Sequence, residues 1–375
     1  MTKTMSIRLK PDTTVMLKMW PHAAGLLVVA GMMAFFAPEP AFETDRGVYE
    51  RMGHEWLVPG CNDFHCFRPL VSWVLGPLPG PPAVIWKAYA VVAQVGAGLA
   101  MAYWVMRWGV SGSTARMVAW LTALGSGACY TLFDPYTSDP LMHLLAPMLM
   151  LLIDRGRVVS ATATSVVGVM AKEFAAAPII VGAAYRALRG QWRDASRLAL
   201  GGVVVVSVWA GWQLFARTIL AYTTGPTYSA DLTTGSFVVF WLLTLSPSLV
   251  ATLMAMVLGG LWLLWPAGLL WGPRELRQLT FASVPAILIF NALQQPDRAL
   301  WNFAFILMPA VALVLDRVPP VMGWMFVAAQ AVLNARFGAQ LLQAPPARFS
   351  FAIAAILAIA ILVRARAATP APAAA

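Results

Sequence analysis

The chain has 375 residues, of which 60% are hydrophobic and only 11% are charged, and its mean hydropathy is +0.71. A soluble domain has about 25% charged residues, so this composition excludes an ordinary soluble globule and predicts an all-α, polytopic helical membrane protein. The net charge of +10 does not indicate nucleic-acid binding, because the basic residues are spread between the apolar runs instead of forming one patch.

The apolar runs predict about 10 to 13 transmembrane or half-spanning helices. They form a single transmembrane domain over residues 1–367, followed by a disordered tail at 368–375. We expect the first run to be a retained helix, because it lacks the small-residue cleavage signature of a signal peptide. The predicted spans are 20–37, 84–107, 114–131, 140–153, 158–171, 174–186, 197–216, 247–271, 279–292, 302–315, 321–334 and 349–363.

The distribution of charge predicts the orientation of these spans. If the N-terminus is cytoplasmic, most Lys and Arg residues fall on the cytoplasmic face, and the basic loop 186–197 is the strongest contribution. The sequence therefore predicts an integral protein of a cytoplasmic (inner) membrane, with both termini in the cytoplasm. The outer face then carries two long loops, 38–83 and 217–236.

The first outer loop begins with a candidate general base, Asp45. A carboxylate at the edge of the membrane, in a partly apolar cleft, can have a raised pKa and accept a proton at neutral pH. The alternative is an ordinary solvated loop acid. Tyr49 follows one helical turn later, which predicts a short interfacial helix with both side chains on one face.

The same loop continues into the stretch GHEWLVPGCNDFHCFRPLVSW, residues 53–73, where Cys61 and Cys66 are five residues apart. Zinc sites usually use C-x2-C spacing, so this C-x4-C spacing argues against a zinc site. On an oxidising outer face the two cysteines are disulfide candidates, with two free thiols as the alternative. Arg68 is a candidate for binding an anionic head group, or a plain loop charge. The side chains of secondary interest, as acceptor contacts, are His54, Glu55, Asp63 and His65.

The hairpin FDPYTSDP, residues 133–140, contains two acids, Asp134 and Asp139. Two carboxylates in a tight turn are candidates for positioning an acceptor or for holding a divalent cation together with phosphate oxygens. The plainer interpretation is that Asp139 caps the helix that follows. His143, one turn later, is expected to be a packed histidine.

Two further pairs of charges interrupt the apolar runs. Lys172 and Glu173 break the run VVGVMAKEFAAAPIIVG, and charges within a membrane segment are costly enough to suggest a function. Lys172 is a candidate phosphate ligand, and Glu173 is its candidate partner or that of an arginine elsewhere; a structural ion pair is the alternative. Asp297 and Arg298 lie between two late spans, where the guanidinium is a candidate for binding an anionic lipid head group, with an ordinary outer-loop charge pair as the alternative.

All of these motifs fall on the predicted outer face, which predicts one shared site. In their order and single-sided placement they resemble the GT-C superfamily of integral-membrane glycosyltransferases and its bacterial relatives. The resemblance rests on DRGVY, FRPL, DPYTSD, the Lys172-Glu173 pair and PDR, and covers most of residues 1–320. It implies transfer of a sugar from a polyprenyl-phosphate donor to an acceptor on the outer face.

By this resemblance, Asp45 deprotonates the acceptor, and Lys172, Arg298 and Arg68 hold the donor phosphate. Two features depart from the superfamily: Glu43 and Asp45 are separated by Thr44, and the soluble C-terminal domain of many members is missing. The alternative functions are a lipid or solute transporter (a flippase among them) and a non-catalytic membrane subunit of a larger complex.

Overall fold

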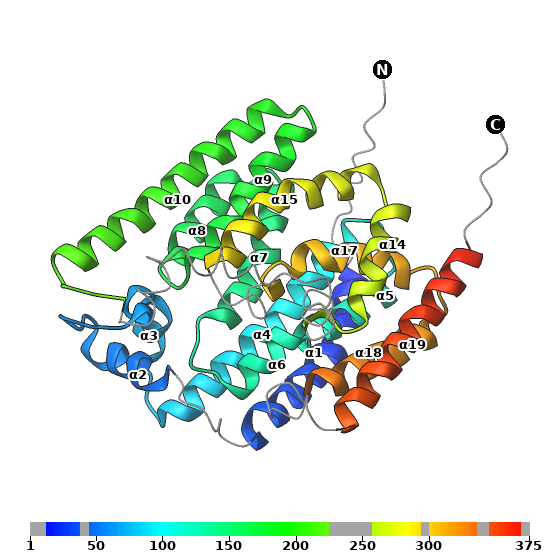
Figure 1. The fold of residues 1–375 in the computed structure, drawn as a ribbon, viewed down its shortest axis with the longest axis horizontal. Coiled ribbons are helices and arrows are strands. Elements are labelled where there is room, and N and C mark those ends of the chain that lie inside the picture. The colour runs from blue at the N-terminus through cyan, green and yellow to red at the C-terminus, as the bar shows by residue number, and fades with distance from the viewer. Residues whose placement is uncertain (1–12, 38–44, 225–256, 294–299, 336–344, 369–375) are drawn as a thin grey trace.

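A computed structural model of the protein describes residues 13–37, 45–224, 257–293, 300–335 and 345–368. Its architecture is all-α, with 15 α-helices and two short 3-10 helices (Figure 1). The α-helices are α1 (Thr13–Phe36), α2 (Arg46–Glu55), α3 (Leu70–Leu75), α4 (Pro82–Met106), α5 (Gly112–Ala123), α6 (Ser126–Phe133), α7 (Asp139–Asp154), α8 (Val158–Val169), α9 (Ala177–Leu188), α10 (Trp192–Thr218), α14 (Leu261–Trp271), α15 (Arg274–Leu293), α17 (Ala304–Leu315), α18 (Pro320–Ala335) and α19 (Pro345–Ala367). The 3-10 helices are η1 (Phe64–Phe67) and η2 (Glu173–Ala176).

In the part of the chain that the structure describes, four helices are long and apolar enough to cross a membrane. They are the 19-residue stretch Lys18–Phe36 of α1, the 25-residue α4, the 27-residue α10 and the 18-residue stretch Ser350–Ala367 of α19. Each coincides with a predicted span. Among the described residues, α8, α14, α17 and α18 are shorter apolar helices. The total number of membrane crossings stays a prediction.

Helix α4 lies at the centre of the bundle and packs against α1, α5, α7 and α17. Its buried faces are rich in alanine, and Gly98 lies against α5. A Cβ added to Gly98 would meet the carbonyl oxygen of Ala119 at 2.6 Å. Small residues of this kind let two helix backbones approach closely, as is typical of helix pairs in membranes.

The predicted span 114–131 is wrong as a single helix, because the chain breaks between α5 and α6 at Leu124 and Gly125. The indole of Trp301 packs at this break, where a Cβ on Gly125 would lie 1.6 Å from the ring. The side-chain amide of Asn334 donates to the carbonyl of Leu124 at 2.9 Å and satisfies an acceptor that the helix leaves. Residues far along the chain therefore impose the break.

Helices α8 and α9 form a short hairpin with η2 at its tip. Each has only 12 residues and is about 18 Å long, whereas the 25 residues of α4 reach about 37 Å. The tip at Lys172 and Glu173 is therefore recessed beside longer helices. The segment α2–η1–α3 lies at the same end as the start of α4 (Figure 1), and the amide of Leu70 donates to the Met170 carbonyl at 3.2 Å.

Polar clusters occupy both ends of these helices. At one end, the side chain of Arg107, after α4, bonds to Asp154, the last residue of α7, at 2.6 Å. The described parts of the predicted site motifs lie at the opposite end, since α7 begins at Asp139 and α8 ends just before Lys172. The single-sided grouping of these motifs therefore appears in the fold. The assignment of that end to the non-cytoplasmic side stays a prediction.

Candidate functional site

Two ion pairs join three segments that are distant in sequence. The Lys172 ammonium donates to the Asp139 carboxylate. The guanidinium of Arg68 donates two hydrogen bonds to Glu173, from Nη2 to Oε1 at 2.7 Å and from Nε to Oε2 at 3.2 Å. Because Lys172 and Glu173 are adjacent, the two pairs form one compact cluster of two cations and two anions.

Local backbone geometry explains why the adjacent residues Lys172 and Glu173 pair with different segments. Lys172 is extended (φ −165°, ψ 137°) between α8 and η2. Successive side chains of extended backbone point to opposite sides, so Lys172 reaches α7 while Glu173 reaches Arg68. The hairpin closes tightly here, because a Cβ on Gly168 would lie 2.7 Å from the Ala175 Cβ.

Asp139 is the first residue of α7, and Ser138 occupies the position before the helix. Asp139 is thus not the capping residue, contrary to the plainer prediction. One of its oxygens binds Lys172, and the other accepts a hydrogen bond from the Thr137 hydroxyl at 3.2 Å. The carboxylate therefore holds the lysine in place.

The cluster is largely removed from solvent. The side chains of Lys172 and Asp139 are 6% and 5% exposed, and those of Arg68 and Glu173 are 10% and 17% exposed. Burial lowers the pKa of Lys172, and Asp139 opposes this effect. Burial also acts to raise the pKa of Glu173, but the charges of Arg68 and Lys172 outweigh it and hold that pKa below its usual value. Glu173 is therefore an ionised partner for Arg68.

Tyr49 lies between this cluster and Asp45. Its side chain is buried against Trp86, with the two ring centres 5.3 Å apart. Burial raises the pKa of the Tyr49 phenol well above its usual value; Arg68 opposes the shift, and the charges of Asp45 and Asp139 add to it. Tyr49 is therefore a neutral hydrogen-bond donor, and its electrostatic neighbours show that both halves of the site surround it.

Asp45 immediately precedes α2 and its side chain is 33% exposed. Its Oδ2 lies 3.2 Å from Nε2 of His65, and Nδ1 of the same ring lies 2.8 Å from Oδ1 of Asp63. Burial acts to raise the pKa of Asp63, but the hydrogen bonds from His65 outweigh it and lower that pKa. A polar cavity of about 560 Å³ adjoins these residues and is lined by Asp45, Asp63, Arg51 and the two cysteines of the loop.

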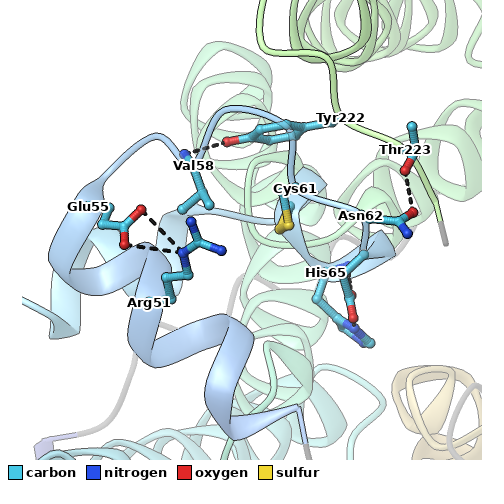
Figure 2. The surroundings of a disulfide bond; sticks show 10 residues. Arg51, Glu55, Val58, Cys61, Asn62, His65, Tyr222 and Thr223 are labelled. Atoms are coloured by element: carbon cyan, nitrogen blue, oxygen red, sulfur yellow. Dashed lines mark hydrogen bonds and ion pairs between the residues drawn. A yellow bond between two sulfur atoms is a disulfide. The ribbon is translucent and has the colours of Figure 1, made fainter.

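Cys61 and Cys66 form a disulfide that closes the loop carrying Asp63 and His65 (Figure 2). The cysteine sulfurs are bonded to each other, which agrees with the sequence argument against zinc. The segment after α10 binds this loop through hydrogen bonds. Figure 2 shows Tyr222 and Thr223 approaching the loop from another part of the fold. The Tyr222 hydroxyl accepts from the Val58 amide at 3.0 Å, and the Thr223 amide donates to the Cys61 carbonyl at 2.9 Å.

An apolar groove of about 480 Å³ runs beside the ion-pair cluster. It is lined by α3, α4, α7 and α8, through Leu70, Tyr89, Leu141, Gly168 and neighbouring residues. Leu70 and Leu141 each follow a charged residue of the cluster by two positions in the chain. The groove thus places hydrocarbon-like surface next to buried cations.

The remaining predicted binding residues fall into two groups, one inside and one outside the described residues. Asp134 ends α6 with a buried side chain, and its role in acceptor or metal binding stays a prediction. Asp297 and Arg298 lie outside the described residues. Within the part of the chain that the structure describes, no group of three or more His, Cys, Asp or Glu side chains could hold a metal ion.

His65 has a more central position than its secondary rank in the sequence suggested, because it bridges two carboxylates. The sequence contained a local signal for the contact between His65 and Asp63. In Asp63-Phe64-His65, an aspartate two residues before a histidine can accept from its backbone amide, and the structure shows this bond at 2.7 Å. The approach of Asp45, 20 positions earlier in the chain, depends on the docking of α2 and has no local signal.

Comparisons with known proteins do not add a family to these observations. No protein-family model matches the sequence. A search of curated proteins also gives no match.

Proposed function

We propose that the protein is an integral-membrane glycosyltransferase of the GT-C type. It moves a sugar from a polyprenyl-phosphate donor to an acceptor at the non-cytoplasmic face. The observation that carries the proposal is the convergence of Arg68 and Lys172, from separate segments, in one buried cluster. An apolar groove is lined by Leu70 and Gly168, which lie within four positions of these cations in the chain, and a polar cavity is lined by Asp45 and the disulfide loop. A lipid-linked sugar has a matching division into an apolar tail, an anionic phosphate and a polar sugar.

The donor phosphate is assigned to Arg68 and Lys172. An ammonium has three N–H donors and a guanidinium has five, so each can bind a phosphate oxygen while keeping its carboxylate partner. Asp139 and Glu173 then position the cations and offset their buried charge before the donor enters. The forked geometry of Arg68 suits phosphate as well as carboxylate.

The lipid tail is assigned to the apolar groove beside α3 and α8. The groove is lined almost entirely by apolar side chains, among them Val71, Val74 and Leu145. A tail that lies there places its phosphate near Arg68, because Leu70 and Val71 follow that residue by two and three positions. Entry from the side requires no passage through water, as a long polyprenyl chain demands.

The acceptor is assigned to the polar cavity at Asp45. A partly exposed carboxylate on the cavity wall can accept the proton of an acceptor hydroxyl. Tyr49 lies between Asp45 and the cations and donates a hydrogen bond to the sugar or phosphate. Asp134 is proposed to help position the acceptor, and Arg298 to add a further charge for the donor.

A transporter or flippase is the second candidate, and the recessed hairpin α8–η2–α9 favours it. Short, interrupted helices with charges at their tips are common at transporter binding sites. The two functions differ in chemistry, since a transporter moves its lipid unchanged. A non-catalytic subunit would neither bind nor transform the lipid.

The test is a transfer assay with purified protein in lipid nanodiscs, a panel of polyprenyl-phosphate sugars and a panel of hydroxyl acceptors. Wild-type protein should form a glycosylated acceptor from at least one donor. Asp45→Asn should slow transfer by about 100-fold or more, the usual effect of losing a general base. Asp194→Asn, which makes the same change in the first turn of α10, is the control. Equal rates for wild type and Asp45→Asn would remove Asp45 as the base, and no product from any donor would contradict the transferase.

A further inference from the structure

His65 stands between two carboxylates, and each ring nitrogen faces one of them. Nδ1 lies 2.8 Å from Asp63 and Nε2 lies 3.2 Å from Asp45. Asp63 also accepts from the backbone amide of His65 at 2.7 Å, so it fixes both the ring and its backbone. A neutral imidazole has one N–H and one bare nitrogen. When the Nδ1–H donates a hydrogen bond to Asp63, Nε2 is the bare nitrogen. It can then receive a proton on the side of Asp45.

The loop that carries His65 is built to hold this geometry. The disulfide between Cys61 and Cys66 encloses Asp63 and His65, and the Tyr49 ring packs against the imidazole with 5.6 Å between ring centres. The polar cavity of about 560 Å³ is lined by Asp45 and Asp63. A proton thus has a short path with an acceptor substrate at one end and solvent at the other.

We propose that His65 is the proton carrier of the transfer reaction: its Nε2 takes the acceptor proton from Asp45, while the ionised Asp63 keeps its hydrogen bond to Nδ1 and stabilises the imidazolium that forms. This inference rests on the proposed function. It assigns to His65 a role that a packed or merely structural histidine would not have.

The step balances as follows. The acceptor oxygen forms a bond to the anomeric carbon of the sugar, and the bond between that carbon and the phosphate oxygen breaks. The bonding electrons leave with the polyprenyl phosphate, beside Arg68 and Lys172. The acceptor proton moves to Asp45 and on to Nε2 of His65. After the product leaves, the Nε2 proton returns to water on the side of the cavity lined by Asp45, which restores the neutral ring while Asp63 stays ionised.

The imidazole gives the acceptor proton a second acceptor, a ring nitrogen 3.2 Å from the Asp45 carboxylate. Among the described residues, the titratable groups in contact with the imidazole are Asp45 and Tyr49 of the α2 segment and Asp63 of its own loop. Arg51 lines the same cavity as Asp45 and Asp63, and the charge of Arg68 acts on Asp63.

The test is the single-turnover transfer rate as a function of pH, measured on the full chain in nanodiscs. The wild-type rate should depend on pH, and His65→Gln should lose about 100-fold or more of the rate together with most of this pH dependence. The apparent affinity for the donor should be unchanged. Added imidazole should restore part of the rate in His65→Ala, because the deleted ring adjoins the cavity. His22→Gln, on α1, is the matched control.

The folding of each variant is checked by its unfolding temperature and by mass-spectrometric detection of the Cys61–Cys66 bond. A folded His65→Gln protein with the wild-type rate and pH profile would overturn the inference and leave the transferase intact. A slow His65→Gln protein that keeps the wild-type pH profile, with no rescue by imidazole, would also overturn it, since that is the mark of a structural role. Absence of transfer by wild-type protein would overturn both.

Discussion

At the scale of single residues, the buried pair of Lys172 and Asp139 differs from the exposed pair of Arg51 and Glu55. The first pair is 6% and 5% exposed, and the second is 58% and 50% exposed. Breaking a buried pair leaves one charge without compensation, whereas an exposed charge is solvated by water. The two pairs should therefore respond very differently to the same kind of substitution.

We predict that Lys172→Met lowers the free energy of unfolding by about 3–5 kcal/mol, because Asp139 is left buried without its counterion. The double variant Lys172→Met, Asp139→Leu should recover most of this loss. Arg51→Ala, the exposed control, should cost no more than about 1 kcal/mol. Chemical unfolding in detergent provides the measurement. Equal losses in the single and double variants would show that the two residues are not energetically coupled.

At the scale of elements, the disulfide loop 61–66 is fastened from both sides. The covalent bond closes it from within, and the segment after α10 binds it through Gly60, whose amide donates to the Leu220 carbonyl at 2.7 Å. Trp212 on α10 adds a bond from its indole nitrogen to the Phe67 carbonyl at 2.9 Å. The loop that holds Asp63, His65 and Arg68 is thus anchored to the longest described helix.

Replacing both Cys61 and Cys66 by serine should destabilise the protein by about 2 kcal/mol, the loop-closure effect for a short loop. The unfolding temperature reports it, with and without a thiol reductant. Reductant should lower the unfolding temperature of wild-type protein and leave that of the double-serine variant unchanged. Cys129→Ala, at the buried thiol on α6, is the control and should keep the response to reductant. A wild-type protein indifferent to reductant would argue against the bond.

The break between α5 and α6 depends on the packing of Trp301 against glycine. We predict that Gly125→Ala destabilises the protein by about 1–3 kcal/mol or more, because the added methyl group overlaps the Trp301 ring. Gly211→Ala on α10 is the matched control, since no atom lies within 4 Å of an added Cβ there. It should stabilise the helix by up to about 1 kcal/mol. The free energies of unfolding of both variants provide the comparison, and a stabilised Gly125→Ala protein would contradict this account of the break.

At the scale of the whole molecule, the sequence was most informative where polarity interrupts the apolar runs. The long apolar runs predicted α1, α4, α10 and α19, and charges at the ends of spans predicted that Asp45, Arg68, Asp139 and Lys172 gather at one end. Both inferences depend on the cost of placing polar groups in an apolar medium, which acts locally along the chain.

The ion-pair partners of these charged residues were less predictable from the sequence, because they depend on how distant helices pack. Lys172 and Glu173 are neighbours in sequence, yet their partners come from α7 and from the loop before α3. The break at Gly125 depends on Trp301, which lies more than 170 positions later in the chain. The bridge from His65 to Asp45 likewise requires α2 to dock on η1.

The central claim is that Arg68 and Lys172 form a phosphate site beside a groove for a lipid tail. The most direct measurement is the dissociation constant of purified protein for polyprenyl phosphate and for the matching polyprenol, by native mass spectrometry. Wild-type protein should bind the phosphate form at least about 10-fold more tightly, a difference of about 1.4 kcal/mol. The double variant Arg68→Gln, Glu173→Gln, which keeps the net charge, should lose most of that difference. Equal affinity of wild-type protein for the two lipids would contradict the account.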